Sequence, residues 1–133
     1  MREILFRGKD KHTGEMIFGT LDNIDEPYQI LFRNPNRNNN VEIHTVITET
    51  VGQYTGLSDK NGTKIFEGDI VEHIDGREQE VMRYAVKWNT DCCMFVLMCE
   101  DTYFGEYSSD FTVFYGEDLE VVGNIYDRGF EFD

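Results

Sequence analysis

The feature that most constrains this chain is a series of short apolar segments separated by tight turns. Within the nineteen residues Gln53–Val71, QYTGLSDKNGTKIFEGDIV, two turns separate three apolar runs. The segment Asp59–Gly62 fits a type I turn followed by a left-handed residue, because aspartate accepts nearby amide protons and glycine tolerates a positive φ. The segment Glu67–Asp69 is a second reversal. The stretch therefore predicts a hairpin and a turn into a third strand, and not a catalytic loop.

Other parts of the chain show the same period of two. Residues 41–48 alternate, with Val41, Ile43, Thr45 and Ile47 on one face and Glu42, His44, Val46 and Thr48 on the other, which predicts a half-buried strand. Residues 81–88 alternate in the same way, with Met82, Tyr84, Val86 and Trp88 on one face. The nearly unbroken apolar run at 92–99 predicts a central strand. No amphipathic helix is evident. The remaining expected strands lie at residues 2–7, 15–18, 28–33 and 119–126.

A similar hairpin sequence occurs twice in the chain. DKHTGEMIFG (Asp10–Gly19) is similar to DKNGTKIFEG (Asp59–Gly68), with an offset of 49 at the aspartate and 48 at the phenylalanine. One residue has therefore been gained or lost between the copies. We interpret them as two hairpins with the same turn chemistry, and not as a duplicated domain. Many short strands with glycine-rich turns predict a small barrel or paired sheets.

A polar, asparagine-rich segment, Asn34–Asn40, predicts an exposed loop and a boundary between two parts of the chain. We expect a mainly β protein with little helix, in two subdomains. Residues 1–40 would form N-terminal β-hairpins, and residues 41–133 would form a small β-barrel, to which the resemblance described below adds an SH3-like character.

Charge is distributed unevenly along the sequence. Residues 1–66 carry 9 acidic and 8 basic residues, whereas residues 67–133 carry 17 acidic and 4 basic ones. No basic residue lies between Lys87 and Arg128. Direct nucleic-acid binding by the second half is therefore not expected, because affinity for phosphates depends on cationic side chains. A basic partner, a bound cation or solubility alone remain as explanations.

The cysteines and histidines do not form a pattern typical of metal binding. Three cysteines (Cys92, Cys93 and Cys99) without framework spacing, and no apolar signal segment, predict free thiols in a reducing cytoplasm. No apolar run approaches a membrane span. A His73–Cys93 or a His44–Cys99 site is conceivable, but buried core cysteines are the favoured interpretation. We expect neither a metal nor a cofactor.

Carboxylates are frequent in the second half, yet none is marked as catalytic. A pair from Glu100, Asp101, Glu106 and Asp110 could be drawn, but nothing gives two of them the different environments that an acid and a base require. No phosphate-binding glycine motif is present. We expect a non-enzymatic protein. The alternative is a small hydrolase or metal-dependent enzyme that uses these C-terminal carboxylates.

Aromatic and acidic residues are interleaved between positions 103 and 115. Such a segment is typical of an interaction surface, because aromatic anchors dominate binding energy and charge selects the partner. We expect Phe104, Phe111 and Phe114 to point inward. A partner protein with a basic surface would then bind the remaining residues, and a homo-oligomer stays open. These expected partner-binding residues are Tyr103, Glu106, Tyr107, Asp110 and Tyr115.

Several of these motifs together resemble the YopX family of phage and prophage proteins. The central signature is TVGQYTGL (Thr50–Leu57), followed by Asp59–Gly62 and by EGDIV (Glu67–Val71), and the two ends, Met1–Arg7 and VVGNIY (Val121–Tyr126), are also similar. The resemblance implies a mostly β protein whose C-terminal part is similar to an SH3-type barrel. It implies no established activity, so no functional residue is transferred. The expected function is that of an accessory phage protein of unknown biochemical role, which would act in the cytoplasm of a bacterial host and bind a host or phage protein.

Overall fold

The computed structural model of this chain describes residues 2–74, 81–91, 93–100, 107–111 and 116–127. Strands dominate, and the only helices among these residues are three 3-10 turns, η1 (Pro35–Arg37), η2 (Thr48–Thr50) and η3 (Gly116–Asp118). The prediction of a mainly β protein with little helix is confirmed. Within the described ranges, no helix is long and apolar enough to span a bilayer.

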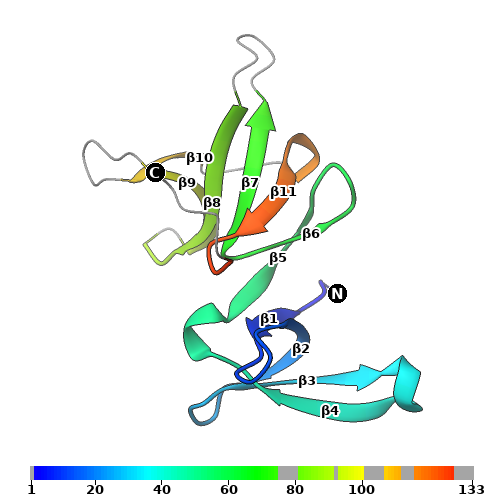
Figure 1. The fold of residues 1–133 in the computed structure, drawn as a ribbon. Helices are drawn as coiled ribbons and strands as arrows, with labels where there is room; N and C mark the ends of the chain where they lie inside the picture. The colour runs from blue at the N-terminus through cyan, green and yellow to red at the C-terminus, as the bar shows by residue number, and fades with distance from the viewer. Residues whose placement is uncertain (1, 75–80, 92, 101–106, 112–115, 128–133) are drawn as a thin grey trace. The chain divides into compact units, whose positions relative to one another are not determined.

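The strands form two antiparallel sheets (Figure 1). The first has the order β4-β3-β2-β1-β5-β6 and the second the order β10-β9-β8-β7-β11. The strands of the first sheet are β1 (Phe6–Lys9), β2 (Met16–Asp22), β3 (Gln29–Asn34), β4 (Asn40–Thr45), β5 (Gly52–Ser58) and β6 (Lys64–Phe66). Those of the second are β7 (Asp69–Ile74), β8 (Val81–Asn89), β9 (Met94–Glu100), β10 (Tyr107–Phe111) and β11 (Glu120–Asn124).

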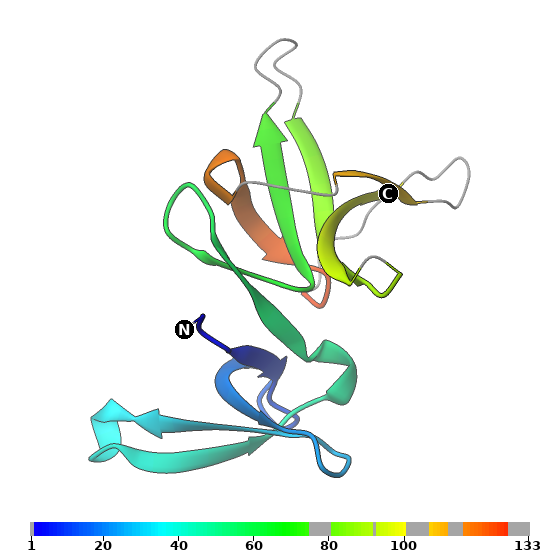
Figure 2. The same ribbon diagram turned by 180° about the vertical axis from the view of Figure 1, so that it is seen from behind.

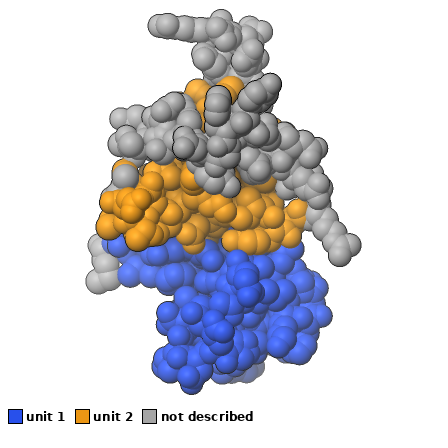
Figure 3. Space-filling view, turned by 90° about the vertical axis from the view of Figure 1, so that its left-hand side faces the viewer, with its two compact units in different colours: residues 1–54 blue, residues 55–133 orange. Residues whose placement is uncertain are grey.

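The chain divides into two compact units, Met1–Tyr54 and Thr55–Asp133, which Figure 3 shows in different colours. The boundary therefore falls inside β5, and not after Asn40 as the asparagine-rich segment predicts. The reason is strand pairing: β4 lies beside β3 in continuous antiparallel register from Gln29–Thr45 to Asn34–Asn40. The polar segment is thus the tip of a long hairpin that ends in η1, as Figures 1 and 2 show from both sides.

The first unit is built around a small apolar centre. Ile30 on β3 and Val46 after β4 are fully buried. The strand predicted at residues 41–48 is present, but the face predicted to be apolar is the exposed one: Val41 is 50% and Ile43 59% exposed. Val46, predicted on the polar face, enters the core instead. The strands approach closely at Gly19, where an added Cβ would lie 2.2 Å from the Leu31 carbonyl oxygen. Any larger residue at this position would push β2 away from β3.

The second unit buries a larger core. Ile65, Val71, Tyr84, Val86, Leu97 and Leu119 pack together, so the alternation predicted for β8 and the apolar run predicted for β9 both place side chains inside. Another close approach occurs at Gly116, where an added Cβ would lie 2.0 Å from the carbonyl oxygen of Ser58. The described strands do not form the closed barrel that an SH3-like subdomain would contain, because β10 and β11 lie at opposite edges of the second sheet.

The repeated turn predicted from the sequence is present in both units. The Gly14 amide donates to the Asp10 carbonyl over 2.9 Å, and the Gly62 amide donates to the Asp59 carbonyl over 3.0 Å. Both glycines have positive φ, +74° and +84°. The additional residue therefore lies inside the first turn, which accounts for the change of offset between the two copies.

Replacing Gly62 with valine is expected to lower the free energy of unfolding by about 1–2 kcal/mol, because a β-branched residue resists a φ of +84°. Replacing Lys60 with alanine should cost at most about 1 kcal/mol, since its 3.2 Å ion pair with Glu120 is partly exposed. Urea unfolding of both variants measures the difference. Equal midpoints would contradict this assignment of the turn.

Candidate functional site

Of the five residues predicted to bind a partner, two lie in the described part of the chain. Tyr107 and Asp110 belong to β10 itself, whereas Tyr103, Glu106 and Tyr115 lie outside the described residues. The predicted inward positions Phe104 and Phe114 also lie outside them. The structure therefore locates the backbone of two of the five residues, at one edge of the second sheet.

Strand pairing gives these two residues a defined neighbourhood along the backbone. Tyr107 pairs with Glu100 on β9, and Phe111 pairs with Leu97. The register shifts between Ser108 and Phe111, so Asp110 lies in an irregular part of the ladder. Irregularities of this kind are frequent at sheet edges and interrupt regular pairing. The carboxylate-bearing residues 100 and 110 thus come from adjacent strands.

Several described acids of the second unit lie at its surface. Some are paired with cations: Glu72 lies 2.7 Å from Arg83, and Glu120 lies 3.2 Å from Lys60. Others are exposed: Asp91 lies in the turn between β8 and β9, and Glu117 and Asp118 form the first turn of η3. The second unit therefore presents acidic side chains to solvent at the β8–β9 turn and at η3.

An aromatic pair lies near the first of these points. Trp88 on β8 is directly opposite Phe95 on β9, with ring centroids 5.0 Å apart in an edge-to-face arrangement. Phe95 packs against the core, but the Trp88 side chain is 46% exposed. Alternation correctly places Trp88 on the face of Tyr84 and Val86. Its exposure follows from its position near the end of β8, which the alternating pattern does not reveal.

The cysteine interpretation needs a correction. Cys93 is exposed, lies just before β9 and has a φ of +53°, so it is not a core residue as predicted. The cause is the turn between β8 and β9, whose strand pairing begins only at Asn89 and Met94. Among the described histidine, cysteine and carboxylate side chains, no group of three could hold a metal ion.

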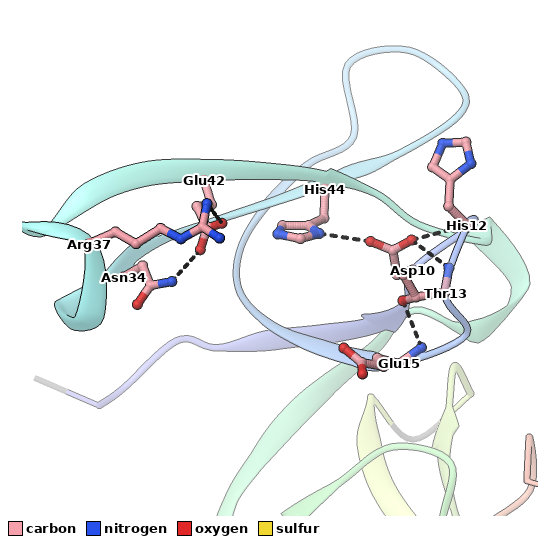
Figure 4. A network of polar contacts seen from close by, with 8 residues as sticks. All are labelled: Asp10, His12, Thr13, Glu15, Asn34, Arg37, Glu42 and His44. Atoms are coloured by element: carbon pink, nitrogen blue, oxygen red, sulfur yellow. Dashed lines mark hydrogen bonds and ion pairs between the residues drawn. The ribbon is translucent and has the colours of Figure 1, made fainter.

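The first unit contains a polar network around Asp10, shown in Figure 4. His44 Nδ1 lies 2.7 Å from Asp10 Oδ2, and Asp10 Oδ1 accepts hydrogen bonds from the amides of His12 and Thr13. The hydrogen bond from His44 and the two amide donors lower the pKa of Asp10 from its ordinary value of 3.8 to about 2. Asp10 is therefore ionised at neutral pH, and Nδ1 of His44 carries the proton that they share.

The surroundings of His44 fix its ring. It stacks on Phe32 with centroids 5.4 Å apart and an interplanar angle of 19°. Further along the same hairpin, Glu42 accepts a 2.7 Å hydrogen bond from Asn34 and lies 3.9 Å from Arg37. A carboxylate-oriented histidine is one part of many acyl-transfer sites. Among the described contacts of this pair there is no hydroxyl or thiol nucleophile, so its evident role is to tie the β1–β2 turn to β4.

A second carboxylate closes the turn in the other unit. Asp59 accepts hydrogen bonds from the amides of Asn61, Thr63 and Val121, at 2.8–2.9 Å. Burial alone would raise the pKa of Asp59, but the three amide donors outweigh it and the pKa is lowered. Asp59 therefore joins its own turn to β11, as Asp10 joins its turn to β4. The sequence reveals the turns but not these long-range partners, which lie 34 and 62 residues away.

Replacing Asp10 with asparagine should destabilise the protein in a pH-dependent way. Because the folded pKa is lowered, the contribution of the ionised carboxylate is complete above the unfolded value of 3.8 and disappears as the pH falls through about 2. The difference in urea midpoint between wild type and Asp10→Asn is therefore expected to be larger at neutral pH than near pH 2. Asp25→Asn, in an exposed loop, is the control. A difference that stays constant with pH would contradict the assignment.

Comparisons with known proteins agree with this architecture. No curated protein matches the chain. Among solved structures, the crystal structure of protein EF1440 from Enterococcus faecalis is similar, with 21% sequence identity, 94% of each chain covered and a TM-score of 0.50. At this identity the likeness concerns the fold alone. The family model of the YopX protein matches residues 5–129, nearly the whole chain. This protein therefore belongs to the YopX protein family.

Proposed function

We propose that this member of the YopX family is a non-enzymatic protein-binding module of phage or prophage origin that acts in the bacterial cytoplasm. Its acidic second half would meet a basic surface on a host or phage protein. The observation that carries the proposal is the charge distribution, with 17 acidic and 4 basic residues in positions 67–133. Such an excess repels itself and costs stability, so folding alone gives no reason to keep it.

The described side chains support this proposal in two ways. Asp91, Glu117 and Asp118 are exposed to solvent, where long-range attraction to a cationic partner acts most freely. Trp88, which packs beside Phe95, is 46% exposed. Exposed tryptophan is enriched among the residues that dominate binding energy. Acidic residues would thus steer the partner, and aromatic residues would anchor it.

The enzymatic alternative has less support. A general acid needs a carboxyl group whose pKa is raised by its surroundings. The described carboxylates with clear shifts, Asp10 and Asp59, both have a lowered pKa. In each, Oδ1 accepts turn amides and Oδ2 contacts a distant strand, at His44 for Asp10 and at the Val121 amide for Asp59. These are properties of structural aspartates. The proposal therefore assigns the carboxylates Glu100, Asp101, Glu106 and Asp110 to partner binding and not to hydrolysis.

A charge-reversal experiment tests the proposal. The variant Glu106→Lys/Asp110→Lys and the control Asp25→Lys/Glu26→Lys change the net charge equally, but the control residues lie in an exposed loop of the first unit. Each protein is immobilised and exposed to an extract of host cells at about 0.1 M and about 1 M salt, between which the Debye length falls from about 10 Å to 3 Å. Wild type and control are expected to retain the same salt-sensitive partner, and the variant to lose it.

Thermal unfolding checks that the variant is intact. Removing like charges reduces self-repulsion, so its melting temperature should equal or exceed that of wild type. A folded variant that keeps the partner with unchanged affinity would overturn the assignment of the surface. Recovery of no salt-sensitive partner by wild type would overturn the proposed function itself.

A further inference from the structure

The strand β4 forms an edge of the first sheet, and the direction of its peptide groups can be derived. The Val46 amide donates to the Tyr28 carbonyl. In an antiparallel ladder the residues that bond to the neighbouring strand alternate with residues whose peptide groups point away from it. Val41 and Ile43 therefore direct their N–H and C=O groups away from β3. Thr45 belongs to the same alternating set as Val41 and Ile43. Its carbonyl also points away from β3, because it accepts a hydrogen bond from the Lys11 amide on the other side of β4.

The open part of this edge is short. At the C-terminal end of β4, the Lys11 amide donates a 2.9 Å hydrogen bond to the Thr45 carbonyl, and the Ile47 amide donates a 2.8 Å hydrogen bond to the Lys9 carbonyl. The β1–β2 turn thus covers the edge from Thr45 onward. Among the described residues, the outward peptide groups of Val41 and Ile43 have no hydrogen-bonding partner, so four groups are available along this edge.

The side chains of the same two residues are exposed as well. Val41 is 50% and Ile43 59% exposed. Their partners across the ladder are Arg33 and Leu31, and the same face continues through Thr20 to Phe18, which is 45% exposed. Natural edge strands are usually protected by charge, proline or a bulge, because unpaired edges with apolar side chains associate. On its apolar face, β4 carries no such protection.

We propose that β4 pairs with β4 of a second copy of this chain, antiparallel and about a two-fold axis at Glu42. In this register Val41 of each copy lies opposite Ile43 of the other, so all four outward peptide groups of each copy find a partner. The apolar side chains of the two copies also meet in pairs. A surface that complements itself in this way is what a two-fold dimer requires.

Charge favours a second copy at this position. The whole chain has a net charge of −14, yet residues 1–54 carry 8 acidic and 6 basic residues. Two like-charged copies repel each other least through this nearly balanced unit. The two Glu42 residues that meet at the axis are each accompanied by Asn34, which donates a 2.7 Å hydrogen bond, and by Arg37 at 3.9 Å. The open edge is short, so it can pair with the equally short edge of a second copy but offers few hydrogen bonds to a longer strand of another protein.

Three variants distinguish strand pairing from simple apolar contact. Val41→Pro keeps an apolar side chain but removes an outward N–H, and proline is tolerated on edge strands where the N–H faces solvent. Ile43→Lys places a charge on the apolar face of the contact. Ile24→Lys makes the same kind of change at a side chain that is 86% exposed in the loop between β2 and β3. Sedimentation equilibrium over a range of concentrations measures the association of each.

Wild type and Ile24→Lys are expected to dimerise in a concentration-dependent way. Val41→Pro and Ile43→Lys should be monomeric at the same concentrations, with the circular dichroism spectrum of the folded wild type. A wild type that remains monomeric at all concentrations, or a folded Val41→Pro that still dimerises, would overturn the proposal. Because the measurement needs no partner protein, its outcome is independent of the proposed function.

Discussion

Both units depend on one interaction, the hydrogen bonds that backbone amides of a turn donate to the carboxylate of a buried aspartate. Asp10 and Asp59 are 6% exposed and Asp69 is 1% exposed. Each accepts backbone amide protons from its own turn, and for Asp69 the donor is the Phe66 amide at 2.7 Å. An ionised carboxylate gains more from such donors than a neutral acceptor does, and it would be costly to bury without them. The turns and the buried acids therefore stabilise each other.

These aspartates also explain how short strands assemble into sheets. Asp10 reaches His44 on β4, and Asp59 reaches the amide of Val121 on β11. In each case a local turn is joined to a strand that is distant in sequence. A hairpin by itself is marginally stable, and the additional carboxylate contact fixes where the hairpin ends relative to the rest of its unit.

Local features of the fold follow from the sequence, whereas its long-range features do not. Period-two alternation predicts the strands, and DKHTG and DKNG predict both turns, because these depend on neighbouring residues. The unit boundary at Tyr54 depends on the pairing of β4 with β3, which composition does not encode. The Asp10–His44 contact is equally non-local. The exposure of Trp88 and Cys93 depends on where β8 ends and β9 begins. Of the predicted site, the structure places only the backbones of Tyr107 and Asp110.

The close approaches at Gly19 and Gly116 have an evolutionary consequence. At both positions a methyl group would lie about one bond length too near to a backbone carbonyl oxygen, at 2.2 Å and 2.0 Å. Backbone cannot rotate aside as a side chain can, so selection will reject every substitution there while the fold is kept. In a set of related sequences these two glycines will therefore rank among the least variable positions. Invariance of that origin marks a steric limit of the scaffold, and it should not be mistaken for the signature of a binding site.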